Sequence, residues 1–212
     1  MRLPRYAGFG AALAFAGPPI YIHAPNLYAT EYGMGLAAIG GLLLGLRALD
    51  FVQDPLIGWW IGRTNMARRH IAAGFAVLLG LGALLLFWPN TLAMPGLRLA
   101  VGLVIVFTGF SALQILFYAS GIALAEQDGV GHGRVAAWRE AGMLAGVCAA
   151  CILPEAAKPL LGATMAYGLF AGLFCIALAV AVKAMANHWP ARRPRAGRRL
   201  DFTLCWRDPV LR

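Results

Sequence analysis

Three charged residues, Arg47, Asp50 and Asp54, stand within a stretch that is otherwise nearly all apolar. Their spacing of three and four residues places them on one face if the stretch is helical. Clustered carboxylate oxygens suit a hard monovalent cation, and a carboxylate can also take up a proton. Pro55 follows Asp54 and cannot donate a hydrogen bond to the Phe51 carbonyl, so this oxygen is a further candidate ligand.

These charges would be costly in a membrane, at about 2.5 to 3.5 kcal/mol each on the scale of helix insertion. We therefore expect them to face the protein interior and not lipid. One interpretation is a buried ion pair that only fixes helix packing. One arginine against two aspartates leaves a surplus negative charge, which favours a site for a cation or a proton.

A second polar stripe consists of uncharged residues spaced by three, three and four positions, Thr108, Ser111, Gln114 and Tyr118. Such a stripe can hold helices together by hydrogen bonds, or it can line a cavity. A neighbouring helix that carries carboxylates favours the cavity. Farther along, Arg139 precedes Glu140 and can either anchor its helix at the membrane surface or bind an anionic or hydroxyl-rich solute.

The histidines and cysteines do not gather into a reactive or metal-binding group. His23 lies at membrane depth, where a packed histidine is expected, and the four cysteines form no recognisable framework. The sequence shows no nucleophile with a base and no set of metal ligands at usable spacing. We therefore expect no enzyme, no cofactor, and no metal beyond a coupling Na⁺ at Asp50 and Asp54.

The apolar stretches that must position these residues predict the fold. Of 212 residues, 60% are hydrophobic and 13% charged, and the mean hydropathy is +0.70, whereas soluble domains carry roughly 25% charged residues. Short segments rich in helix breakers, the last of them Pro154 to Pro159, separate six apolar blocks of spanning length. The blocks cover 7–28, 36–62, 71–88, 98–124, 136–153 and 160–184. The sequence thus predicts an all-α integral membrane protein, a bundle of six transmembrane helices.

The net charge of +9 would suggest nucleic-acid binding in a soluble protein. Its distribution argues against this, because fifteen Lys and Arg residues fall on the side of the termini and only Arg98 and Lys158 on the other. This bias predicts a multi-pass protein of the inner (cytoplasmic) or plasma membrane with both termini cytoplasmic. The basic run Arg192 to Arg199 is then expected to lie beside anionic membrane lipid.

The stretch from Arg47 to Thr64, RALDFVQDPLIGWWIGRT, resembles the melibiose-permease branch of the major facilitator superfamily, the glycoside, pentoside and hexuronide:cation symporters. The resemblance implies that Asp50 and Asp54 hold the coupling Na⁺ or H⁺. The segment SALQILFY, Ser111 to Tyr118, resembles the family segment that completes the cation site and meets the sugar. Ser111 and Gln114 would then complete the cation site. The expected substrate contacts are Tyr118, Arg139 and Arg47.

Three departures from the family pattern matter as much as the matches. Gln114 stands where characterised sugar symporters carry a carboxylate, and Gly62 replaces the acid that usually precedes Arg-Thr. The first apolar block has no acid before Glu31, so the sugar-grasping aspartate of the family is missing. The resemblance therefore implies cation coupling more strongly than it implies sugar specificity.

The resemblance implies one half of a major facilitator fold, because members have two six-helix halves with the substrate between them. We expect a six-helix bundle at 1–186 and a basic cytoplasmic loop or tail at 187–212 that leads toward a missing second half. The expected function is cation-coupled transport of a small polar solute, such as a sugar or glycoside, with a second half or a second copy as partner. The alternative is a nontransporting membrane domain, a remnant or an assembly partner whose buried charges only specify packing.

The charge bias makes a prediction about topology. Reporter fusions after Arg5 and after Arg199 should both report the cytoplasm, because Lys and Arg are retained on that side. A periplasmic signal from either fusion would contradict the predicted orientation.

Overall fold

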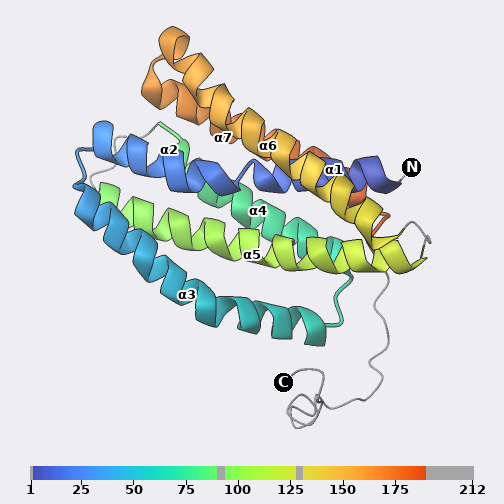
Figure 1. Cartoon of the computed structure of the whole chain (residues 1–212). Coiled ribbons are helices and arrows are strands. Elements are labelled where there is room, and N and C mark those ends of the chain that lie inside the picture. The colour runs from blue at the N-terminus through green and yellow to red at the C-terminus, as the bar shows by residue number, and fades with distance from the viewer. Residues whose placement is uncertain (1, 90–93, 128–130, 190–212) are drawn as a thin grey trace, which may run out of the picture.

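The computed structural model describes residues 2–89, 94–127 and 131–189, which form seven helices and no strand (Figure 1). The helices are α1 (Arg2–Ala14), α2 (Gly17–Thr30), α3 (Leu36–Arg63), α4 (Arg68–Phe87), α5 (Pro95–Gln127), α6 (His132–Leu161) and α7 (Ala163–Met185). The all-α prediction is therefore confirmed. The basic run Arg192 to Arg199 and most of the predicted tail at 187–212 lie outside the described residues.

Five of these helices, α3 to α7, are long and apolar enough to cross a membrane. The block at 7–28, predicted as one span, is divided, because α1 ends at Ala14 and α2 begins at Gly17. Pro18 and Pro19 lack the N–H groups that would bond to the carbonyls of Ala14 and Phe15, which accounts for the break. Each piece is shorter than the ~20 residues of a spanning helix. Figure 1 shows the two pieces end to end.

The segment Pro154 to Pro159, predicted as a break between helices, lies inside α6. The helix continues to Leu161 and ends at Gly162, whose φ of 76° favours glycine. An interior proline removes one backbone hydrogen bond, and Pro154 in this way frees the carbonyl of Ala150. A helix can continue through such a position when a neighbouring group satisfies the freed carbonyl.

His23 of α2 supplies that group. Its Nε2 lies 3.2 Å from the Ala150 oxygen, and the side chain is 3% exposed. The ring also packs near Tyr167 and Phe170 of α7. The expectation of a packed histidine at this position is confirmed, and its partner explains why α6 survives Pro154.

Arg98, near the start of α5, closes the end of α4. Its guanidinium donates to the carbonyl oxygens of Leu85 at 2.6 Å, of Leu86 at 3.3 Å and of Trp88, and to the Tyr32 hydroxyl at 2.9 Å. The last carbonyls of a helix have no partner within it. Arg98 is buried and therefore acts as a side-chain cap.

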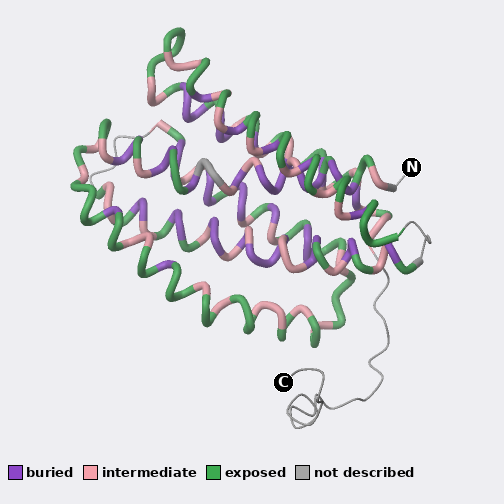
Figure 2. The backbone as a smooth tube through the Cα atoms, viewed as in Figure 1, coloured by how far each residue is buried: buried purple, intermediate pink, exposed green. Residues whose placement is uncertain are grey.

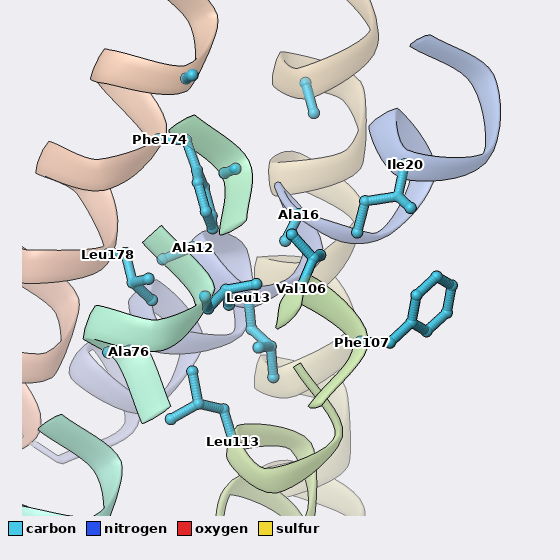
Figure 3. Packing of buried hydrophobic residues seen from close by; sticks show 14 of the residues in the cluster. Ala12, Leu13, Ala16, Ile20, Ala76, Val106, Phe107, Leu113, Phe174 and Leu178 are labelled. Carbon is cyan, nitrogen blue, oxygen red and sulfur yellow. The ribbon is translucent and has the colours of Figure 1, made fainter. Parts of the chain in front are cut away.

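Small residues bring helix backbones into direct contact. Gly142 and Gly146 of α6 lie against Ala7 and Ala11 of α1, and a Cβ atom at either glycine would collide with a carbonyl oxygen of α1. This four-residue spacing of small residues is typical of packed membrane helices. Between the helices, buried apolar side chains from α1, α4, α5 and α7 meet in one cluster (Figure 3).

The long helix α3 lies at the edge of the bundle. It packs mainly on α5, with a smaller contact to α2, and its buried residues are Ile39 and Leu46. Figure 2 shows exposed and intermediate positions along most of its length. Large apolar side chains are among them, including Leu44 at 74% and Phe51 at 85% exposure. This face is therefore available to lipid or to another helical bundle.

The glycine contact predicts the effect of a larger residue. Gly146→Leu should lower the free energy of unfolding in detergent by about 3 kcal/mol, because the α1 and α6 backbones must separate. Gly172→Leu is the matched control, since a Cβ atom at Gly172 meets nothing within 4 Å. Thermal unfolding of both variants measures the difference. Equal unfolding temperatures for the two variants would contradict this account of the α1 and α6 packing.

Candidate functional site

Arg47 does not pair with the aspartates on its own helix. Its guanidinium carbon lies 4.8 Å from the centre of the Tyr21 ring on α2. In the described part of the chain, no ion pair joins Arg47 to Asp50 or Asp54. The cation–π contact with Tyr21 takes the place of the buried ion pair that was the alternative interpretation, and neither carboxylate has a cationic side chain in direct contact among the described residues.

Asp50 has an unsatisfied carboxylate oxygen. The side chain is half-buried, and its Oδ1 is buried without a hydrogen-bond partner among the described residues. Asp54, one turn farther along α3, adds a second negative charge that acts on Asp50. A buried polar atom without a partner is costly, and here a like charge increases that cost. The position therefore favours an added proton or cation.

Gln53 contacts α5 at the same level and was not singled out from the sequence. Its Oε1 lies 3.2 Å from Thr108 Oγ1, and its Nε2 is buried without a partner among the described residues. Thr108 also lies 2.7 Å from the Val104 carbonyl, which can receive its single hydroxyl hydrogen. With the carboxamide turned by 180°, its NH₂ group donates to Thr108 and its oxygen occupies the buried position.

Gln53 is therefore a further candidate oxygen ligand beside Asp50. A signal in the sequence could have identified it, because Gln53 lies three residues after Asp50 and directly before Asp54. An uncharged amide within a membrane helix attracts less attention than a carboxylate. Its burial against α5 becomes apparent only from the packing of the two helices.

The first residue of the polar stripe of α5, Thr108, contacts α3. Thr108 contacts Gln53, and Ser111, one turn later, is 7% exposed. In the described residues, no hydrogen bond or ion pair connects Ser111 or Gln114 to Asp50 or Asp54. The contact of the stripe with α3 is thus made through Thr108 and Gln53, and the cation-site roles expected for Ser111 and Gln114 stay predictions.

The other end of the stripe meets Arg139 of α6. The Gln114 Nε2 lies 3.5 Å from the Tyr118 hydroxyl, and the Arg139 guanidinium carbon lies 5.0 Å from the centre of the Tyr118 ring. Arg139 also donates to Oε1 of Glu140 at 2.9 and 2.6 Å. The structure therefore brings three predicted site residues together, one amide, one phenol and one guanidinium.

Two groups of candidate residues thus share α5. The first group consists of Asp50, Gln53 and Thr108, and the second group consists of Tyr118 and Arg139. Ten residues separate Thr108 from Tyr118 on the helix, a distance of about 15 Å along its axis. Within the described ranges, no cluster of three His, Cys, Asp or Glu side chains could hold a metal ion. Chemically, the first group offers anionic and amide oxygens, and the second offers an aromatic face with hydrogen-bond donors.

The comparisons with known proteins identify one family. A family model described as MFS/sugar transport protein matches residues 5–200 of the chain. Comparison with the curated proteins gives no match, and comparison with the solved structures gives none. The matched range includes both groups of candidate residues.

Proposed function

Because the chain belongs to the MFS/sugar transport family, we propose that it forms the N-terminal half of a cation-coupled secondary transporter. The transported solute is a small polar molecule, such as a sugar or glycoside. The observation that carries the proposal is the buried Oδ1 of Asp50, which has no hydrogen-bond partner in the described chain and lies near a second carboxylate. A Na⁺ ion or a proton supplies the missing partner.

The oxygen ligands for Na⁺ come mainly from α3. Asp50 and Asp54 provide charge, and Gln53 provides an amide oxygen in its second orientation. Ser111 and Gln114 are the expected contributions from α5. The pairing of Arg47 with Tyr21 supports this assignment, because the arginine leaves the carboxylates available to a cation.

A freed backbone carbonyl supports the same site. Pro55 lies inside α3 and removes the helical donor of the Phe51 carbonyl, as Pro154 does for Ala150 in α6. His23 satisfies the Ala150 carbonyl. In the described chain, no side chain donates a hydrogen bond to the Phe51 carbonyl. Broken hydrogen bonds of this kind supply backbone oxygens to cations in transporters.

The chemistry of the second group suits a neutral, hydroxyl-rich solute. The Tyr118 ring offers an apolar face and is 37% exposed. Arg139 offers donors, while its ion pair with Glu140 compensates its charge and adds acceptor oxygens. A polyol can use donors and acceptors together, whereas an anion would have to compete with Glu140. Arg47 is the third proposed substrate contact, with its guanidinium held over Tyr21.

Transport also needs a second bundle. Alternating access rocks one bundle against another around a site at the membrane midplane. We propose that α1 and α2 cross the membrane together as the sixth span, and that the exposed face of α3 contacts a second six-helix half or a second copy. Both termini of the chain lie in the cytoplasm under the predicted topology.

The cation site predicts a loss of binding on neutralisation. Asp50→Asn and Asp54→Asn should each abolish cation-stimulated solute binding, and Gln53→Leu should weaken Na⁺ binding by about tenfold, the equivalent of one lost ligand at roughly 1.4 kcal/mol. Calorimetric titration of the assembled transporter with Na⁺, and with protons as pH is varied, measures this directly. Glu31→Gln is the control, since it removes an exposed carboxylate elsewhere. Wild-type cation stimulation in both aspartate variants would refute the site.

The half-transporter proposal predicts that the isolated chain does not transport as a monomer. Reconstituted alone, the 212-residue protein should be unstable or dimeric, because the exposed face of α3 then lacks the second bundle that the proposal assigns to it. Ion-gradient-driven uptake of glycosides and light-scattering mass in detergent check this together. Robust uptake by a monomer would contradict the proposal, and an active dimer would assign the second bundle to a second copy.

A further inference from the structure

A groove of about 560 Å³ runs between α4 and α7, away from the residues of the proposed transport site. Its walls are apolar along most of their length. They include Val77, Leu81, Leu84, Leu178 and Val182. Several of these side chains are exposed, with Val77 at 63% and Leu81 at 57%. Near the middle, Gly80 has no side chain and Cys175 Sγ lies 3.6 Å from its carbonyl oxygen, so the floor is formed by small groups.

One end of this groove carries positive charge. Arg69 and His70 lie in the first turn of α4, and Lys183 lies in the last turn of α7. The two helices run antiparallel, so the start of α4 lies beside the end of α7. All three polar residues therefore lie at the same end of the groove. Among the described residues that line the groove, none is acidic. The groove therefore combines a cationic end with a long apolar channel.

The dimensions of the groove fit one leaflet of a membrane. Arg69 and Leu84 are fifteen residues apart on α4, or about 22 Å along the helix. One leaflet contributes about half of the ~30 Å hydrocarbon core, and the headgroup layer lies beyond it. A molecule that fills the groove needs an anionic head and an apolar chain of roughly this length.

We propose that this groove binds an anionic glycerophospholipid, with its phosphate at Arg69, His70 and Lys183 and one acyl chain between α4 and α7. Basic pockets between membrane helices on the cytoplasmic side bind such headgroups, and the predicted topology places this end in the cytoplasmic leaflet. The proposal requires a membrane-embedded bundle and does not depend on the transported solute.

A second groove of similar volume provides an internal comparison. It measures about 550 Å³ and is lined by α1, α6 and α7. Its lining contains one cation, Arg5, and that guanidinium lies 2.7 Å from Nε2 of His188. A lipid in this second groove meets a single positive charge that already has a partner. Of the two grooves, we expect only the one between α4 and α7 to prefer anionic lipid.

The test compares two phospholipids with identical acyl chains, phosphatidylglycerol and phosphatidylcholine, by native mass spectrometry of the full chain in detergent. Each Lys or Arg near a headgroup favours an anion roughly fivefold, so two should give phosphatidylglycerol an advantage of about twenty-five-fold. Arg69→Gln with Lys183→Gln should remove that advantage. The control pair Arg63→Gln and Arg134→Gln removes the same charge from exposed positions outside the groove and should leave it unchanged.

A second variant tests the acyl chain. Ala179→Phe places a ring inside the groove from an exposed position and should reduce the affinity of both lipids by about tenfold or more. Retained preference in the Arg69 and Lys183 variant, or an equal loss in the control pair, would overturn the proposal. Unchanged lipid affinity in Ala179→Phe, or full displacement of lipid by glycerol phosphate, would also overturn it, because only a headgroup would then be bound.

Discussion

A backbone carbonyl that loses its helical partner inside a membrane must find another donor, and the architecture of this bundle depends on how each loss is met. Pro18 and Pro19 end one helix and start the next, so the first apolar block becomes α1 and α2. Pro154 leaves α6 continuous because His23 reaches the Ala150 oxygen from α2. At Pro55 the Phe51 carbonyl loses its helical donor near Asp50 and Asp54, where a cation can bind the freed oxygen.

Close packing of small residues determines where the polar groups stand. Gly142 lies one turn beyond Arg139 on α6, and its contact with Ala7 fixes the distance between α6 and α1. Arg139 is thereby held where it can cover Tyr118 of α5. In contrast, α3 has few buried residues and contacts the bundle along one side. The helix that carries the carboxylates is thus the one with the least packing of its own.

Composition and block length were sufficient to predict an all-α membrane protein and the five helices long enough to span. Composition and block length could not distinguish a proline that ends a helix from one that a neighbouring helix accommodates. The group that accommodates Pro154 is His23, which is distant from it in sequence. Helical spacing predicted that Asp50 and Asp54 lie about one turn apart, and both are on α3, whereas the cation site itself stays a prediction. Spacing also suggested an ion pair with Arg47, whereas Tyr21 from another helix binds the guanidinium. Gln53 was missed because its burial depends on Thr108.

The cap made by Arg98 has a consequence for biogenesis. Its acceptors are the Tyr32 hydroxyl and the final carbonyls of α4, all of which leave the ribosome before Arg98 does. The guanidinium therefore finds its complete set of acceptors as soon as α5 begins to emerge. We expect α4 and α5 to enter the bilayer as a hairpin, with the arginine carried across already bonded to the end of α4. In that order of synthesis, the charge that should oppose translocation is stabilised by hydrogen bonds to carbonyl oxygens at the end of the helix that precedes it.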